Sequence, residues 1–140
     1  MKKQCRNEIE QLHMFFTDWF TGAVENTDAN FGRVADVLAP DFVLVSPRGR
    51  VFDRDGILAQ IREAHAGRDA GAFRIWTDEF ALRFSEGPLS IATYREWQDT
   101  GREQTCRMST VVLRKHPTTP NRVEWVHLHE TWLPAAPGQS

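Results

Sequence analysis

A glutamate close to the carboxyl-terminal end of the chain, Glu130, is the residue whose setting most suggests chemistry. It lies in residues 123–133, which are rich in β-branched and aromatic residues and so predict a strand. Alternate residues of a strand point to the same face, so Glu130 shares an apolar face with Leu128 and Trp132. An ionised carboxylate does not lie among apolar groups without a partner, a raised pKa or access to water. Glu130 is therefore a candidate acid or base in a pocket, or one half of an ion pair.

An arginine on another expected strand, Arg95, is the candidate partner of this carboxylate. Alternation places it on the apolar face of residues 89–99, and one strand separates that segment from the strand of Glu130. Two strand spacings put the backbones about 10 Å apart, which long side chains can bridge. Two interpretations follow. The pair is either a structural ion pair near the sheet edge, with the carboxylate held ionised, or part of a pocket that is mostly apolar with a few convergent polar groups.

The same alternation selects the side chains that would line such a pocket. They come from the first helix and from the core-facing sets of the long strands: His13, Phe16, Trp19, Thr93, Trp97, Met108, Thr110, Leu128 and Trp132. A lone histidine such as His13 is more often packed and hydrogen-bonded than catalytic. The opposite face is expected to be aromatic and mixed polar, which suits a protein interface. This outer set comprises Tyr94, Glu96, Arg107, Ser109, Val111, Trp125, His127, His129 and Thr131.

The sequence predicts neither a metal nor a cofactor. His127 and His129 lie two residues apart on one strand, but no third ligand with a recognised spacing accompanies them. Cys5 and Cys106 form neither a disulfide framework nor a metal motif, so both are expected to be free thiols. A Gly-x-Ser-x-Gly nucleophile motif is absent from the sequence as well.

Length and composition limit the classes of protein to consider. The chain has 140 residues, 41% hydrophobic and 26% charged, as expected of one globular domain. Its formal net charge of -2 offers no basic surface for nucleic acid. The amino-terminal residues have the charge but not the apolar run of a leader, and no stretch of about 18 apolar residues occurs. A cytoplasmic protein that binds neither nucleic acid nor membrane is expected.

The order of periodic segments predicts the fold class. Helical spacing covers residues 8–25, a short helix covers 31–38, and a third helix is capped by Asp53. A short strand at 41–46 precedes that third helix. Four long strands follow, joined by short turns that indicate an antiparallel meander: 73–85, 89–99, 104–115 and 123–133. The sequence thus predicts an α+β domain over residues 1–134, with helices on one face of a curved sheet, and a loose tail at 135–140.

This order of elements, together with Leu38-Ala39-Pro40-Asp41-Phe42-Val43, Pro47-Arg48-Gly49-Arg50 and the ending Trp125-Val126-His127-Leu128-His129, resembles the nuclear-transport-factor-2-like superfamily over nearly the whole chain. Its SnoaL-like members and the association domain of calcium/calmodulin-dependent kinase II are the most similar branches. The resemblance implies a cone-shaped, cystatin-like fold in which a strongly curved antiparallel sheet wraps three amino-terminal helices. It also implies a pocket at the open end of the cone and a homodimer through the outer sheet face.

Function does not follow from this resemblance, because the superfamily includes isomerases, dehydratases, cyclases and epoxide hydrolases as well as non-catalytic domains. Ketosteroid isomerase activity is rejected: Ser46 stands where those enzymes carry an aspartate, and Tyr94, the only tyrosine, is expected on the outer face. The kinase association domain carries arginines in its cavity at the positions that correspond to Thr93, Thr110 and Glu130 of this chain. The anion-binding character of that cavity is therefore not expected here.

Two hypotheses about function remain, and the sequence names no ligand for either. In the first, the chain is a dimeric small-molecule-binding domain with an apolar pocket and acid–base chemistry of the lyase, isomerase or cyclase type, in which Glu130 is the acid or base and Arg95 orients it. In the second, it is a non-catalytic ligand-binding or accessory dimer.

Overall fold

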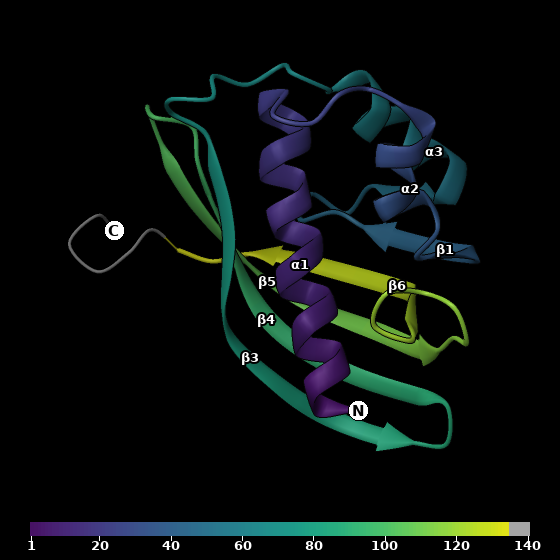
Figure 1. Cartoon of the computed structure of the whole chain (residues 1–140). Helices are drawn as coiled ribbons and strands as arrows, with labels where there is room; N and C mark the ends of the chain where they lie inside the picture. The colour runs from purple at the N-terminus through teal and green to yellow at the C-terminus, as the bar shows by residue number, and fades with distance from the viewer. Residues whose placement is uncertain (135–140) are drawn as a thin grey trace.

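The computed structural model describes residues 1–134, which form three helices and a six-stranded curved sheet (Figure 1). The helices are α1 (Lys2–Thr21), α2 (Asp28–Ala35) and α3 (Arg54–Glu63). The strands are β1 (Leu38–Val45), β2 (Val51–Asp53), β3 (Arg74–Glu86), β4 (Leu89–Asp99), β5 (Gln104–Lys115) and β6 (Val123–Trp132). The predicted α+β class, with helices packed on a curved sheet, is confirmed. The predicted loose tail lies outside the described residues.

The helix ends follow local sequence signals. Helix α1 stops at Gly22, whose φ of 78° is in the left-handed region that glycine adopts without a Cβ clash. Thr27 caps α2 by accepting a hydrogen bond from the Asn30 backbone N–H. Asp53 accepts one from the Gly56 backbone N–H, which confirms the predicted cap of the third helix. None of the helices in residues 1–134 is long and apolar enough to cross a membrane.

The strands follow the order β2-β1-β6-β5-β4-β3. The meander from β3 to β6 is antiparallel, as predicted, whereas β1 runs parallel to β6 and begins three residues earlier than the sequence indicated. The sheet curves around α1, which lies along its concave side, while α2 and α3 lie beside β1 (Figure 1). The concave face therefore looks onto helices, and the convex outer face is left uncovered by the residues that the structure describes.

The predicted orientation of β4 and β5 is wrong. In β4 the buried residues are Ser90, Ala92, Tyr94 and Glu96, one position out of step with the expected set. In β5 the concave set is likewise Arg107, Ser109, Val111 and Leu113. A shift of one residue turns every side chain of a strand to the other face, so this single error affects both strands.

The orientation of β6 is partly as predicted. Leu128 and Glu130 are buried, and the exposed His129 lies on the other face. Trp125, expected outside, is 2% exposed and belongs to the core. The register shifts between Val112 and Leu113 of β5, which are paired with His127 and Trp125 of β6. The extra residue is a β-bulge, which lets Trp125 and Leu128 face the same side although they are three positions apart.

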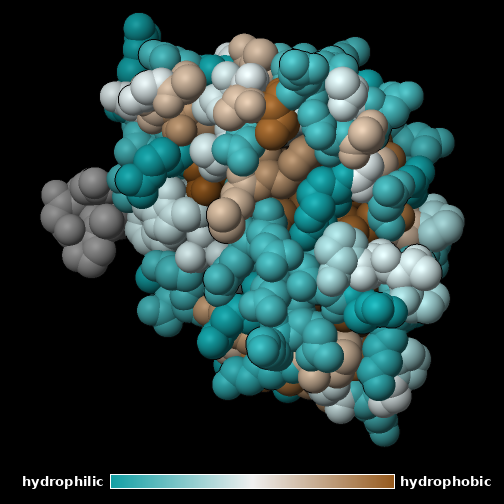
Figure 2. Space-filling model, in the orientation of Figure 1, coloured by the Kyte–Doolittle hydropathy of each residue, from teal (hydrophilic) through white to brown (hydrophobic). Residues whose placement is uncertain are grey.

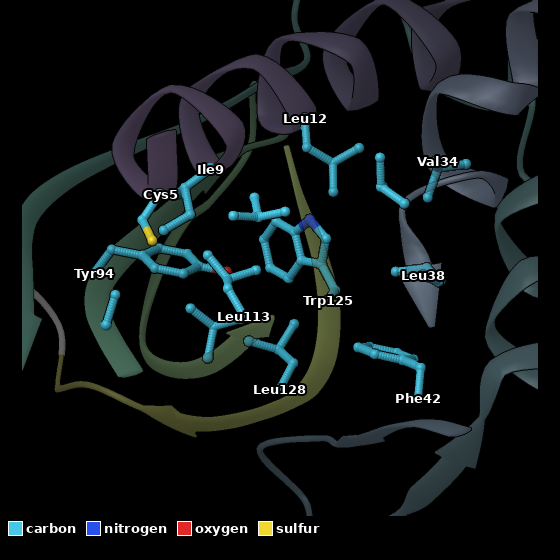
Figure 3. Close-up of a cluster of buried hydrophobic side chains, with 14 of the residues drawn as sticks. Cys5, Ile9, Leu12, Val34, Leu38, Phe42, Tyr94, Leu113, Trp125 and Leu128 are labelled. Carbon is cyan, nitrogen blue, oxygen red and sulfur yellow. The ribbon is translucent and has the colours of Figure 1, made fainter. Parts of the chain in front are cut away.

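A buried carboxylate holds the amino-terminal half of α1 against the rest of the core. Glu8 is fully buried and accepts four hydrogen bonds. Two come from the Arg33 guanidinium at 2.9 and 3.1 Å, one from Asn121 Nδ2 at 3.0 Å and one from Trp125 Nε1 at 2.9 Å. Trp125 lies at the centre of the apolar cluster drawn in Figure 3, among Leu12, Leu113 and Leu128.

Candidate functional site

A cavity of about 270 Å³ lies between α1 and the concave face of the sheet, and residues of α3, β1 and β2 also contribute to its wall. Most of its lining is apolar: Leu12, Phe16, Phe20, Val34, Leu38, Phe42, Leu44, Phe52, Ile57, Ile61, Ile75, Trp125 and Leu128. Apolar side chains also reach the surface in the upper half of Figure 2, where α2, α3 and the carboxyl-terminal half of α1 lie, whereas the lower half is mostly hydrophilic. The charged side chains of the lining are His13, Glu96, Arg107 and Glu130.

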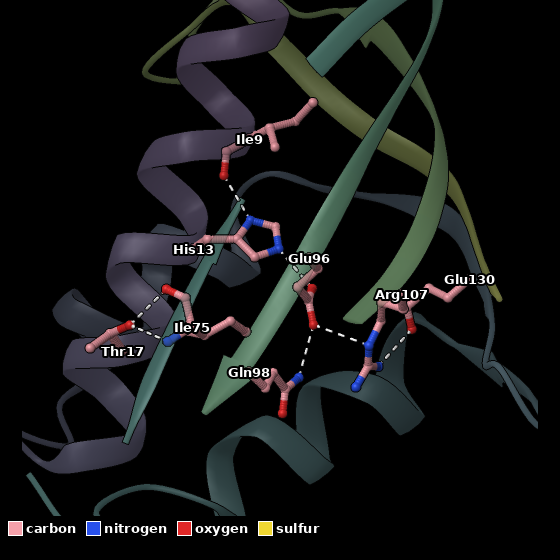
Figure 4. Close-up of polar contacts among 8 residues, drawn as sticks. All are labelled: Ile9, His13, Thr17, Ile75, Glu96, Gln98, Arg107 and Glu130. Carbon is pink, nitrogen blue, oxygen red and sulfur yellow. Dashed lines mark hydrogen bonds and ion pairs between the residues drawn. The ribbon is translucent and has the colours of Figure 1, made fainter. Parts of the chain in front are cut away.

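His13 connects α1 to this charged group (Figure 4). Its Nδ1 is 2.7 Å from the Ile9 carbonyl oxygen, and its Nε2 is 2.8 Å from Glu96 Oε1. The Ile9 carbonyl oxygen and an ionised Glu96 carboxylate can only accept hydrogen bonds. Both ring nitrogens of His13 therefore donate, and the ring is an imidazolium. Burial alone would lower the pKa of His13, but the hydrogen bond to Glu96 and its charge raise that pKa above the usual value.

Glu96 on β4 is the most strongly held carboxylate of the site. Besides His13, it accepts a hydrogen bond from Gln98 Nε2 at 2.8 Å and pairs with Arg107, whose Nε is 3.4 Å from Oε2. Burial opposes ionisation, but His13, Arg107 and Gln98 outweigh it and lower the pKa of Glu96 to about 2. Glu96 is therefore a fixed negative charge at neutral pH.

Glu130 on β6 is held much more weakly. Its contact with a cation is one bond from Arg107 Nη1 to Oε1 at 3.3 Å, and Arg107 is shared with Glu96. Burial and the charge of Glu96 raise the pKa of Glu130 to about 7, against the partial compensation of Arg107. A carboxyl group that titrates near neutral pH can act as either an acid or a base.

The structure brings together four of the predicted site residues: His13, Phe16, Leu128 and Glu130 line the cavity. Trp19 lies behind the wall, fully buried, and its Nε1 donates to the Ile61 carbonyl oxygen at 2.8 Å. Trp132 is 42% exposed, and the Arg107 guanidinium lies 4.6 Å from its ring centroid. The functional roles of all these residues stay predictions.

The predicted placement of Arg95 is wrong. Arg95 lies on the outer face, where its Nε and Nη2 donate to the Asp78 carboxylate at 2.7 and 2.8 Å and its guanidinium stacks over Trp97. The inverted orientation of β4 and β5 is the physical reason, because it places five predicted site residues outside: Thr93, Arg95, Trp97, Met108 and Thr110. Arg107 occupies the position beside Glu130 that was expected for Arg95.

The placement of Tyr94 is also corrected. Tyr94 was expected on the outer face, but it is fully buried and its ring lines the cavity. One of the two reasons for rejecting ketosteroid isomerase activity therefore no longer holds. The other stands, because the cavity wall carries Ser46 where those enzymes have an aspartate.

Sequence reasoning missed Glu96, Gln98 and Arg107 as site residues. A signal for two of them was present, since Glu96 and Arg107 are directly opposite in the register of β4 and β5. Opposite charges facing each other across neighbouring strands stabilise a sheet pair. No group of three or more His, Cys, Asp or Glu side chains within residues 1–134 is arranged to hold a metal ion. Cys5 and Cys106 are both free and buried.

We expect Glu130 to be coupled energetically to Arg107 and not to Arg95. Arg107→Met leaves two buried carboxylates, those of Glu96 and Glu130, without this cation. In a Glu130→Gln background the same change leaves only one carboxylate without it. The coupling energy should therefore be about 1–3 kcal/mol in urea unfolding of the double-mutant cycle. The matched cycle of Arg95→Met with Glu130→Gln should give a value near zero. Equal coupling in both cycles would contradict the assignment.

We expect Glu130 to make the folded state less stable as the pH rises. With its pKa at about 7 in the folded protein against 4.5 without the fold, the folded state retains a proton that the unfolded chain has released. Stability should thus fall between pH 4.5 and 7, by about 3 kcal/mol. The pKa of His13 is also raised, so its deprotonation lowers the stability of the folded state as the pH rises. All variants keep His13, so this contribution is common to them.

Urea unfolding at pH 5 and pH 8 checks this expectation. Glu130→Gln cannot titrate, so its loss of stability between the two pH values should be smaller than that of the wild type. Glu103→Gln removes an exposed carboxylate from the β4–β5 turn and should behave like the wild type. The same loss in Glu130→Gln and the wild type would show that Glu130 does not carry the effect.

Comparison with known proteins assigns the chain to a family. The family described as "Sucrose-6-phosphate phosphohydrolase C-terminal" matches residues 5–134. Sucrose-phosphatase 1 of Nicotiana tabacum is 30% identical over 131 residues, which are 92% of this chain and 31% of that protein. The chain thus spans about a third of the length of the curated relatives that it matches.

Solved structures agree on the fold. A crystal structure of an NTF-2-like protein of unknown function from Pseudomonas aeruginosa superposes with a TM-score of 0.82 at 29% identity, covering 94% of this chain and 99% of that one. An uncharacterised protein with a cystatin-like fold from Caulobacter vibrioides gives a TM-score of 0.62 at 16% identity, with 89% and 87% covered. The predicted superfamily and cystatin-like fold are confirmed, but the matching family is not specifically the SnoaL-like branch. The chain belongs to the sucrose-6-phosphate phosphohydrolase C-terminal family, within the nuclear-transport-factor-2-like superfamily.

Proposed function

We propose that this chain is a small-molecule-binding domain and that its ligand occupies the cavity between α1 and the concave face of the sheet. The observation that carries the proposal is the cavity itself, whose walls are apolar except for one group of charged side chains. Binding sites for small molecules commonly combine an apolar wall with a few polar groups that fix orientation. The apolar part of a ligand would lie against Phe16, Phe42 and Leu128, and its polar part would lie near Glu130.

We further propose that the domain is accessory to a catalytic unit and does not itself hydrolyse a phosphate ester. The relatives are named sucrose-phosphatases, and this chain corresponds to about a third of their length. The cavity is a poor environment for a phosphate group, because Arg107 is already paired with both Glu96 and Glu130. A phosphate dianion would meet two carboxyl groups without a free cation, and like charges at short range repel.

A second candidate function is acid–base catalysis of the lyase, isomerase or cyclase type. One specific observation favours it: the pKa of Glu130, raised to about 7 by burial and by the charge of Glu96, suits proton transfer at neutral pH. In this candidate Glu130 would exchange a proton with the ligand, and Arg107 would take the orienting role first expected for Arg95.

Filling the cavity should abolish ligand binding without unfolding the protein. Ser46 lies in the wall and is only partly buried, so Ser46→Phe would place a ring in the cavity at small structural cost. We expect a library of uncharged small molecules to give hits by thermal shift and by NMR in the wild type, and these hits to disappear in Ser46→Phe. Thr110→Phe makes a comparable addition at an exposed position outside the cavity and should retain them. Hits that survive in Ser46→Phe would contradict the proposed location.

We also propose that two copies of the chain associate through the outer sheet face. The outer set expected from the sequence included Tyr94, Val111 and Trp125, which the structure buries. The outer face nevertheless carries a row that runs in register across five strands and is apolar except for one histidine: Phe84, Ile91, Val112, His127 and Val43. Trp76 and Trp97 stack on the same face, with ring centroids 6.1 Å apart. An apolar row and a tryptophan pair on one uncovered face favour an interface between copies.

Sedimentation velocity at micromolar concentration tests the dimer. We expect a dimer for the wild type and a monomer for Val112→Glu, which places a charge in the middle of the apolar row. Met14→Glu introduces the same charge at a residue of α1 that is 66% exposed, and it should remain dimeric. A wild-type protein that sediments only as a monomer would refute the proposal.

A further inference from the structure

Three oxygen-bearing side chains form a row on the concave face of the sheet. Tyr94 of β4 pairs in register with Ser109 of β5, which in turn pairs with Glu130 of β6. All three residues are buried, at 0%, 0% and 7% exposure. Tyr94 and Glu130 also line the cavity, and Ser109 lies between them in the register without forming part of the wall. The row therefore spans three neighbouring strands at the charged end of the cavity.

Two members of this row have no hydrogen-bond partner among the residues that the structure describes: the hydroxyls of Tyr94 and Ser109. Buried polar groups in native proteins are nearly always paired, and leaving one unpaired costs about 1–3 kcal/mol. Burial and the nearby charges of Glu96 and Glu130 raise the pKa of Tyr94 well above its usual value, against the smaller opposing effects of the neighbouring Ser109 hydroxyl and of Arg107, so its O–H remains a donor. The carboxyl group of Glu130, when protonated, is a third O–H donor in the same row.

The surrounding charges limit what this row can receive. Every charged residue lining the cavity belongs to one group, in which His13 is bonded to Glu96 and Arg107 is shared between Glu96 and Glu130. A carboxylate or phosphate entering here would gain no free cation and would face two acidic side chains. A neutral oxygen would accept hydrogen bonds from the row without this repulsion.

We propose that the cavity takes an uncharged, mostly apolar molecule bearing a hydrogen-bond-accepting oxygen, and that the hydroxyl of Tyr94 and the carboxyl group of Glu130, the two members of the row that line the cavity, hold that oxygen. This inference rests on the proposed binding function and adds the chemical class of the ligand. The apolar wall accommodates the body of the molecule, and the row fixes the position of its oxygen.

Three probes of nearly equal shape separate the effects of a neutral oxygen and of a negative charge on binding from that of the apolar body: 2-acetylnaphthalene, 2-ethylnaphthalene and 2-naphthoate. They present a neutral carbonyl oxygen, no oxygen and an anionic group on the same two-ring body. Titrations at pH 6, followed by protein NMR, should give the ketone a dissociation constant about tenfold lower than that of the hydrocarbon, as expected for one or two added hydrogen bonds. The naphthoate should bind no more tightly than the hydrocarbon.

Tyr94→Phe tests the row itself. It should remove most of the advantage of the ketone and leave the affinity for the hydrocarbon unchanged. Thr110→Val, which removes a hydroxyl from an exposed residue outside the cavity, should leave the advantage intact. Because the Tyr94 hydroxyl is unpaired, its removal should not lower the melting temperature of the free protein. A clear drop would mean that the hydroxyl is already paired, and it would overturn the inference.

Other outcomes separate this inference from the binding function on which it rests. Ketone and hydrocarbon of equal affinity, or a naphthoate that binds most tightly, would overturn the proposed ligand class while leaving a binding cavity in place. Failure of all three probes to shift cavity resonances would also overturn that class. In that case the library screen against the wild type and Ser46→Phe decides whether the binding function falls with it.

Discussion

The ion pair and hydrogen bond between His13 and Glu96 set the electrostatics of the cavity. Burying a carboxylate is costly unless cations and donors compensate it, and Glu96 obtains them from α1 through His13, from its own strand through Gln98 and from β5 through Arg107. The contact also fixes the long helix against the sheet at the mid-point of its length. Once Glu96 is held ionised, its charge acts on Glu130, and the remaining cation, Arg107, has to serve two carboxyl groups.

A second buried carboxylate, Glu8, shows what a purely structural solution looks like in the same fold. Its two oxygens accept four bonds of 2.9–3.1 Å, from Arg33, Asn121 and Trp125. Glu130 receives a single bond of 3.3 Å from a shared arginine. The two residues are almost equally buried but differ in how fully their oxygens are satisfied. Carboxyl groups with a raised pKa that border a cavity are candidates for functional residues, so the contrast favours Glu130 over Glu8 as the functional candidate.

Much of the fold could be predicted from the sequence, because the order of helices and strands depends on local patterns. These patterns are the helical spacing of α1, the Asp53 cap and the short turns of the meander. The site could be predicted only in part. Glu130 was identified because apolar neighbours surround it on β6. Glu96 was missed because its set on β4 has only one aliphatic residue, Ala92. The outer face carries Ile91 and Trp97, so counting apolar residues favoured the wrong side. The bulge that turns Trp125 inward depends on pairing with β5 and leaves no local signal.

The distinction between an anchor and a catalyst at Glu130 depends on the ligand more than on the protein. With its pKa raised to about 7, the carboxyl group occurs in both the protonated and the ionised form near neutral pH, and a bound group shifts that balance. A ligand oxygen that only accepts hydrogen bonds favours the protonated form and raises the pKa further, which makes Glu130 an anchor. A ligand with an acidic C–H or O–H near the same oxygen favours the ionised form, and Arg107 is already placed to stabilise it. The same arrangement therefore supports binding alone or proton transfer, and the acidity of the bound molecule selects between them.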